Sequence, residues 1–225
     1  MAAFLLEGPM LLIFDCDGVL VDSEPLACQV DAEVLTALGL PYTADEIARH
    51  FVGKSMRDMI ARIEAEHGRT LPADFAERIN SALFARFETD LKPIEGVGEA
   101  IRSLPYPRCV ASSSVPERIA LSLRVTNLAD LFENIFSATQ VARGKPAPDL
   151  FLFAAEQMGA HPEECLVIED SPAGVQAASS AGMRVIGFTG GGHCGPDHAE
   201  RLRQAGAPVT ISRMADLPAA VQAFG

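Results

Sequence analysis

A short apolar run near the N-terminus ends in two acidic residues, and this feature constrains the fold more than any other. Residues 11–14 read LLIF and are followed by Asp15, Cys16, Asp17 and Gly18. Four consecutive apolar residues are typical of a strand covered on both faces, and Gly18 permits a sharp turn after it. The run therefore places two carboxylates at the carboxyl end of a buried strand, where open α/β sheets bind ligands. Taken alone, D-x-D-G fits a capped turn equally well.

Composition limits the function classes. The chain has 225 residues, 48% of them hydrophobic, which suffices for one sizeable domain or a core with a small insert. It has neither an apolar run of about 18 residues nor a basic leader, so we expect a cytoplasmic protein without a membrane partner. The five cysteines form no C-x-x-C pair, which argues against a disulfide scaffold or a zinc site.

The net charge of −12 argues against a nucleic-acid partner. A bound divalent cation and a few local basic residues could still make a pocket attractive to an anion. The sequence does not determine the oligomeric state, and a monomer is the working expectation.

Periodicity predicts an α/β fold with a helical insert. A helix is expected over 24–39, with Ser23 as its N-cap and Pro25 in its first turn. Residues 42–89 show helical spacing and almost no strand signal. The further predicted strands are 109–112, 134–137, 165–168, 184–188 and 209–211, and the further predicted helices are 97–104, 116–124, 149–158, 173–181, 197–205 and 217–224. This alternation predicts a Rossmann-like, doubly wound parallel sheet from residues 1–22 and 91–225, and a small all-helical cap domain over 23–90.

Three further polar groups follow predicted strands. Ser112 to Ser114 could bind a phosphoryl oxygen or simply cap the next helix. Lys145, in a loop with two prolines, could pair with a phosphate or a carboxylate, or be an ordinary solvated lysine. Glu169 and Asp170 could hold a cation, or lie favourably at a helix N-terminus. Oxygen ligands of this kind favour Mg²⁺.

Together these groups make the chain similar to the haloacid dehalogenase-like hydrolase superfamily. The four motifs of the resemblance are Asp15-Cys16-Asp17-Gly18, Ser112, Lys145 and Glu169-Asp170, and the resemblance spans nearly the whole chain. It implies that Asp15 is the nucleophile that forms an aspartyl-phosphate, and that Asp17 protonates the leaving group and then activates water. An acid at position 17 argues against the dehalogenases and phosphonate hydrolases of this fold.

The resemblance also implies a metal and a substrate class. Mg²⁺ is expected on Asp15, the Asp17 carbonyl and Asp170, with Glu169 assisting. Ser112 and Lys145 are expected to hold the transferring phosphoryl oxygens. The substrate is expected to be a small phosphorylated metabolite, a sugar or polyol phosphate.

Within the superfamily the chain resembles the β-phosphoglucomutase-like and sugar-phosphate phosphatase branch. The expected substrate contacts are Gly53, Lys54, Ser55 and Arg57 in a cap loop, and Ser113 beside the second motif. The mutases carry a histidine where Ala27 stands and an arginine where Met56 stands, so a phosphatase is expected and a phosphosugar mutase is the alternative. A binding protein with a relic active site is a third hypothesis, against which the intact motifs argue.

Residues 190–195 match G-x-G-x-x-G, a dinucleotide-binding pattern. Too few residues follow to complete a nucleotide-binding half, so a flexible loop is expected. His193 and His198 could suggest a metal, but two histidines without a third ligand are weak evidence.

Overall fold

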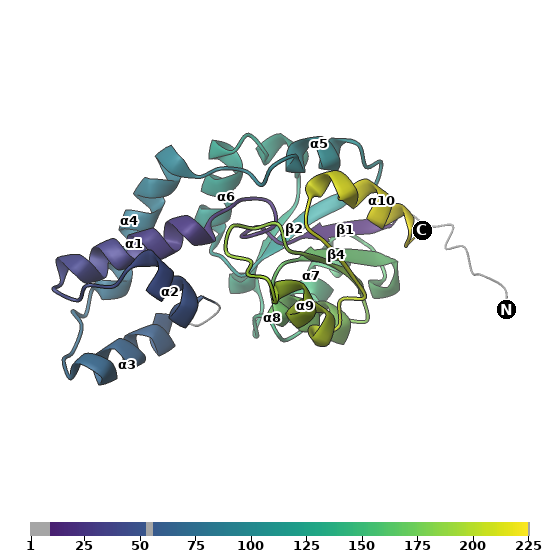
Figure 1. The fold of residues 1–225 in the computed structure, drawn as a ribbon. Coiled ribbons are helices and arrows are strands. Elements are labelled where there is room, and N and C mark those ends of the chain that lie inside the picture. The colour runs from purple at the N-terminus through teal and green to yellow at the C-terminus, as the bar shows by residue number, and fades with distance from the viewer. Residues whose placement is uncertain (1–9, 53–55, 225) are drawn as a thin grey trace. The chain divides into compact units, whose positions relative to one another are not determined.

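The computed structural model describes residues 10–52 and 56–224 (Figure 1). The chain divides into two compact units, one formed by residues up to Asp22 and from Lys92 onward, the other by Ser23–Leu91. Within the described residues, no helix has the length and apolar character needed to cross a lipid bilayer.

The first unit is built on a sheet of six parallel strands. They are β1 (Leu11–Phe14), β2 (Arg108–Ser112), β3 (Ile135–Ser137), β4 (Cys165–Glu169), β5 (Arg184–Phe188) and β6 (Val209–Ile211). Their order is β3-β2-β1-β4-β5-β6, so the chain winds outward in both directions from β1. Phe14 of β1 pairs with Val110 on one side and with Ile168 on the other. In this topology the strand order reverses between β1 and β4, which is where such sheets form a ligand crevice.

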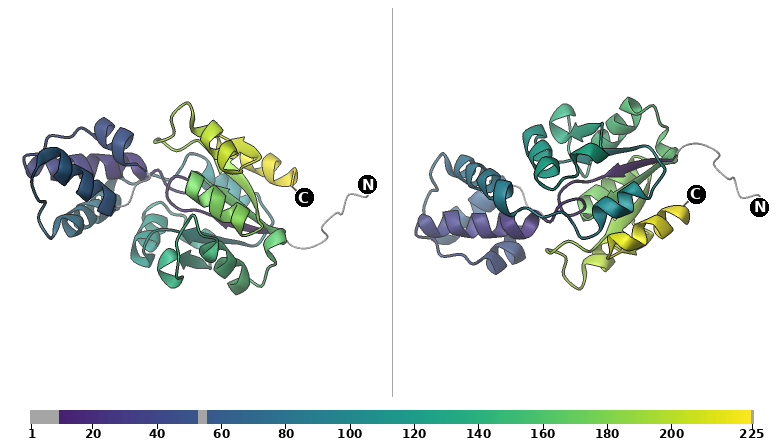
Figure 2. Two further views of the ribbon diagram at one scale, coloured as in Figure 1. Left: turned by 90° about the horizontal axis from the view of Figure 1, so that it is seen from below. Right: turned by 90° about the horizontal axis from the view of Figure 1, so that it is seen from above.

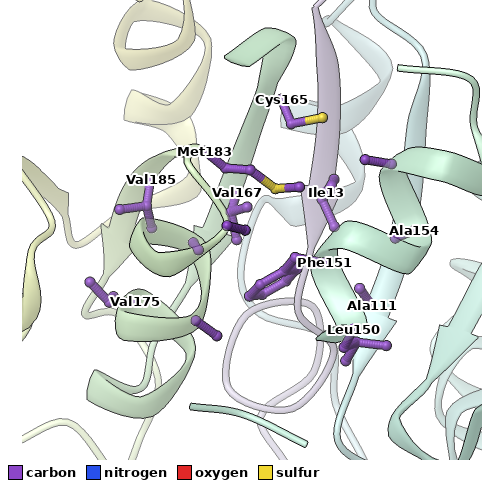
Figure 3. Packing of buried hydrophobic residues seen from close by; sticks show 14 of the residues in the cluster. Ile13, Ala111, Leu150, Phe151, Ala154, Cys165, Val167, Val175, Met183 and Val185 are labelled. Atoms are coloured by element: carbon purple, nitrogen blue, oxygen red, sulfur yellow. The ribbon is translucent and has the colours of Figure 1, made fainter. Parts of the chain in front are cut away.

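Helices cover both faces of this sheet, which confirms the predicted doubly wound fold (Figures 1 and 2). They are α5 (Val97–Arg102), α6 (Pro116–Val125), α7 (Asp149–Gln157), α8 (Pro172–Ser180), α9 (His198–Ala205) and α10 (Leu217–Gln222). Helices α7, α8 and α9 lie on one face, and α5 and α10 on the other (Figure 1). On the first face Ile13, Val167 and Phe151 belong to one buried cluster (Figure 3). This layer fixes the ends of β1 and β4 against each other.

The second unit is helical. It contains α1 (Glu24–Ala37), α2 (Ala44–Phe51), α3 (Met56–His67) and α4 (Phe75–Asp90), which share a buried apolar cluster. Helix α2 begins with a capping box, in which the Thr43 hydroxyl accepts from the Glu46 N–H and the Glu46 carboxylate accepts from the Thr43 N–H. Ser23 is the N-cap of α1 and Pro25 lies in its first turn, as predicted, although the Ser23 side chain makes no capping hydrogen bond.

The predicted elements differ from the observed ones mainly at their ends. The predicted helix 97–104 ends at Arg102, and the predicted strand 165–168 continues to Glu169. Asn134 lies before β3, although its carbonyl still accepts from the Val110 N–H at 3.1 Å. These shifts are small. They arise because helix and strand ends depend on tertiary contacts that hydrophobic periodicity does not contain.

Candidate active site

Asp15 and Glu169 are brought side by side by the parallel ladder between β1 and β4. The Asp15 N–H donates to the Ile168 carbonyl at 3.0 Å, so the ladder continues one residue beyond β1. Glu169 is the last residue of β4 and is fully buried, and Asp15 is 8% exposed. Two carboxylates therefore lie in the interior at the point where the strand order reverses.

Lys145 joins these two carboxylates. It lies in the loop before α7, and its Nζ is 2.7 Å from Glu169 Oε1 and 3.0 Å from Asp15 Oδ1. Nζ also donates to the Ala111 carbonyl at 3.1 Å. Its side chain is only 4% exposed, so the solvated-lysine alternative was wrong. Burial lowers the pKa of Lys145, but the charges of Asp15 and Glu169 raise it by more than burial lowers it. The pKa therefore lies above its ordinary value, and the ammonium stays charged.

Two glycines make room for the acids. A Cβ on Gly18 would lie 1.8 Å from Asp170 Oδ2, and a Cβ on Gly174 would lie 1.7 Å from Glu169 Oε1. Gly18 also has a φ of +78°, in the left-handed region that favours glycine. The turn after β1 can therefore approach the end of β4 closely enough for Asp15 and Asp170 to share one site.

Asp17 is held by two side chains, Ser114 and Arg118, that were not predicted to contact it. Ser114 Oγ donates to Asp17 Oδ2 at 2.6 Å, and an Arg118 guanidinium nitrogen donates to Asp17 Oδ1 at 2.9 Å. Arg118 is on α6, far from Asp17 in the sequence, and no local pattern marks it. Ser114 belongs to the serine run 112–114, which was predicted to bind a phosphoryl oxygen or to cap the next helix, and not to contact Asp17.

The serines after β2 do not cap the following helix. Val115 is the N-cap of α6, which has no side-chain capping bond. Ser112 is buried, and its hydroxyl accepts from the Ser114 N–H at 3.1 Å. The helix-cap alternative was therefore wrong: the Ser112 hydroxyl bonds within the loop, and the Ser114 hydroxyl donates to Asp17.

His193 is a further residue that sequence reasoning did not place at the site. Its Nε2 lies 3.1 Å from Asp170 Oδ2, and the two side chains are 8% and 7% exposed. Burial lowers the pKa of His193, but the hydrogen bond and charge of Asp170 prevail and raise it to about 10. The loop that carries His193 is tied down, since the Gly192 N–H donates to Asp22 Oδ1 at 2.8 Å. A short glycine-rich stretch gives no signal for such an inward turn.

The acids suit a hard cation. Ligand oxygens of Asp15, Glu169 and Asp170 lie within 4.8 Å of one another. Burial raises the pKa of Asp15 well above its ordinary value, Lys145 lowers it, and Glu169, Asp170 and Asp17 raise it further. Asp15 Oδ1 makes an ion pair with Lys145 but accepts no well-aligned hydrogen bond from the described residues. A divalent cation would compensate this excess of buried negative charge, so the residues present fit Mg²⁺.

The expected substrate contacts are less defined. Gly53, Lys54 and Ser55 lie outside the described residues. Arg57 is exposed near the start of α3, in the helical unit, and Ser113 is exposed after β2. The structure thus brings together Asp15, Lys145, Glu169 and Asp170, with Asp17 following on the same turn, and leaves the substrate contacts as predictions.

The sequence also matches known proteins. The model of the haloacid dehalogenase-like hydrolase family matches residues 12–188. The chain belongs to this family. Among its relatives, the 6-phosphogluconate phosphatase of Escherichia coli is 33% identical over 187 residues, which cover 82% of this chain and 85% of that protein. The phosphorylated carbohydrates phosphatase of Thermotoga maritima is 35% identical over 179 residues, covering 78% and 82%.

Solved structures give the same family. A haloacid dehalogenase-like protein of unknown function from Agrobacterium tumefaciens has a TM-score of 0.88 and 43% identity, covering 96% of this chain and 99% of that chain. The family match over residues 12–188 therefore includes all the side chains that converge at the β1–β4 switch point.

Proposed function

We propose that the protein is a Mg²⁺-dependent phosphatase of small phosphorylated metabolites, with sugar or polyol phosphates as the substrate class. One observation carries this proposal: Asp15, Lys145, Glu169 and Asp170 converge at the β1–β4 switch point. The family match supports a hydrolase, and the two relatives, both named as phosphatases of phosphorylated carbohydrates, support a phosphoric monoester hydrolase.

The side chains suit a two-step transfer. In the first step an Asp15 carboxylate oxygen attacks phosphorus, the ester P–O bond breaks, and Asp17 gives its proton to the leaving alkoxide. In the second step water attacks the aspartyl-phosphate, Asp17 takes a proton from that water, and Asp15 is released with inorganic phosphate. Ser114 and Arg118 position the Asp17 carboxylate for the proton transfers.

The remaining groups stabilise charge. Asp15, the Asp17 carbonyl and Asp170, assisted by Glu169, would hold Mg²⁺. When bound, Mg²⁺ would neutralise negative charge on the phosphoryl group. Lys145 offsets the charge of Asp15 and, with Ser112, would bind the transferring oxygens. The loop of Gly53, Lys54 and Ser55, together with Arg57 and Ser113, is proposed to contact the rest of the substrate.

The test is phosphate release with Mg²⁺ from a panel of phosphorylated sugars, polyols and other metabolites. The Asp15→Asn variant is the blank, because it keeps the side-chain shape and removes the nucleophile. Release confined to one or a few sugar or polyol phosphates, and absent in Asp15→Asn, is the expected result. Substantial turnover by Asp15→Asn would contradict the covalent mechanism.

The same experiment addresses the mutase alternative, which the relatives do not favour. Interconversion of β-glucose 1-phosphate and glucose 6-phosphate that depends on glucose 1,6-bisphosphate would replace the phosphatase by a mutase. No turnover in folded protein that binds Mg²⁺ would instead support a binding protein.

A further inference from the structure

A second group of metal-ligating side chains lies beside the acidic site. It consists of His193, Cys194 and His198, from the loop after β5 and the first residue of α9. One ligand atom from each lies within 4.8 Å of the others. The pair of histidines alone was weak evidence for a metal, and Cys194 supplies the third ligand that the pair lacked.

One of two distances matches that between ligands of a tetrahedral cation, and the other is about 0.3 Å shorter. Zinc bond lengths of about 2.3 Å to sulfur and about 2.0–2.1 Å to nitrogen or oxygen imply S···N and N···O separations of about 3.6 and 3.4 Å. Cys194 Sγ is 3.6 Å from His193 Nε2, and His193 Nε2 is 3.1 Å from Asp170 Oδ2. Asp170 Oδ2 therefore lies beside one ligand atom of the group, that of His193.

The His198 imidazole is oriented as that of a metal ligand usually is. His198 Nε2 donates to the backbone carbonyl of Asp170, which leaves the lone pair of His198 on Nδ1. His193 Nδ1 is buried and has no hydrogen-bond partner among the described residues, whereas Nε2 faces Asp170 and Cys194, so a cation at Nε2 would replace those two contacts.

Cys194 lies within reach of a cation bound by the histidines, since its Sγ is 3.6 Å from His193 Nε2. The thiolate is the ligand form of cysteine. Of the five cysteines, Cys194 is also the only one that is not buried.

We propose that His193, Cys194 and His198, with Asp170 as a shared ligand, form a second metal site that takes Zn²⁺ or a similar borderline-soft divalent cation. Sulfur and imidazole select such cations, whereas the all-oxygen set of Asp15, Glu169 and Asp170 selects Mg²⁺. A cation here replaces the protons on the His193 and Cys194 ligand atoms, which are released to solvent. The two sites meet at Asp170.

A consequence follows for the proposed phosphatase, and this part rests on that function. Zn²⁺ bound at this second site takes Asp170 Oδ2 as a ligand, and Asp170 is also one of the side chains proposed to bind Mg²⁺. Zn²⁺ therefore inhibits Mg²⁺-dependent hydrolysis, whereas its binding requires no phosphatase activity.

The test is titration of the purified protein with Co²⁺ and Zn²⁺ in excess Mg²⁺, under a non-chelating phosphine reductant. Co²⁺ reports a thiolate ligand through its sulfur-to-cobalt charge-transfer band, which an oxygen-only site does not give. One Co²⁺ per chain with this band, displaced by Zn²⁺, is expected. Cys194→Ser should abolish the band and weaken Zn²⁺ binding by at least about 10- to 100-fold, since even the loss of a supporting residue costs that much.

Matched variants control for other cysteines and histidines. Cys28→Ala, in α1 of the helical unit, and His161→Gln, at an exposed position, should bind as the wild type does. No charge-transfer band in the wild type, or a band that survives Cys194→Ser, would overturn the site.

Activity gives an independent readout. Inhibition by Zn²⁺ that is weakened at least about 10-fold in Cys194→Ser supports the shared role of Asp170. Zn²⁺ binding without inhibition of an active enzyme would overturn that role. Absence of turnover without Zn²⁺ would reject the phosphatase, while the spectroscopic result would still decide the metal site.

Discussion

Replacing Lys145 with methionine removes the ammonium group that lies between two buried carboxylates. Nζ lies 3.0 Å from Asp15 Oδ1 and 2.7 Å from Glu169 Oε1, and it is 4.8 Å from the centroid of the Phe151 ring. Methionine is unbranched and keeps an apolar stem against that ring, so the loss is mainly electrostatic. We expect Lys145→Met to lower the free energy of unfolding of the α/β unit in a pH-dependent way.

The magnitude follows from protonation. The pKa of Asp15 is already raised by burial, and Lys145 is the neighbour that lowers it most. Without Lys145 one carboxyl must take up a proton, which costs about 4 kcal/mol at pH 7 and about 1.5 kcal/mol at pH 5 for an ordinary pKa near 4. The pH 7 figure agrees with about 3–5 kcal/mol for removing one partner of a buried ion pair.

The sign of the pH dependence follows from the bound proton. The folded variant then binds one more proton than its unfolded chain over this range, so its stability falls as the pH rises. The deficit relative to the wild type is therefore larger at pH 7 than at pH 5.

The assay is thermal unfolding at pH 5 and pH 7, with a chelator and with Mg²⁺. At about 2–4 °C per kcal/mol, Tm should fall by about 10 °C at pH 7 and by about half as much or less at pH 5. Mg²⁺ should raise the Tm of Lys145→Met more than that of the wild type, because a cation replaces the lost charge.

Lys92→Met, at an exposed lysine of the same unit, is the matched control and should change Tm little. A loss below about 1 kcal/mol for Lys145→Met at pH 7, or an equal loss at both pH values, would refute the electrostatic reasoning.

Three smaller changes test other parts of the structure. Gly18→Ala should abolish phosphate release, because its Cβ would lie 1.8 Å from Asp170 Oδ2. Gly68→Ala is the control, because Gly68 has a φ of +62° with open space around it, so this variant carries only the backbone strain of about 1–2 kcal/mol and no steric clash. Equal activity in the two variants would contradict the steric argument. Iodoacetamide at neutral pH should modify Cys194 before the other four cysteines, as peptide mapping would show, because its pKa is lowered and it is only partly buried. Thr43→Ala should cost the helical unit about 1 kcal/mol in denaturant unfolding through loss of the α2 cap, and an unchanged midpoint would count against that cap.

The sheet could be predicted because its strands carry a strong local signal. Strands β1 and β4 are buried on both faces, so each reads as a continuous apolar run that ends in acids. The prediction located Asp15, Glu169 and Asp170 at one sheet edge, because parallel strands bring their carboxyl ends together. The ends of the individual helices in the helical insert were not predicted, because α2 to α4 follow one another with similar helical spacing.

The contacts that complete the site could not be predicted in the same way. Arg118 reaches Asp17 only because α6 begins at Pro116, directly after the β2 loop, and His193 reaches Asp170 only because the Gly190–Gly195 loop turns inward. Both depend on the path of a loop and not on a periodic pattern. Lys145 was recognised through the family resemblance, whereas composition alone favoured a solvated side chain.

The position of β1 at the centre of the sheet has a consequence for how the protein is made. Leu11 pairs with Cys165, so β1 lacks one of its two neighbours until β4 has been synthesised. Closing so long a loop is entropically costly, and such non-local pairing slows folding. The acidic cluster therefore does not exist on any nascent chain that stops before Asp170. Metal binding at this cluster therefore reports that β1 has paired with β4.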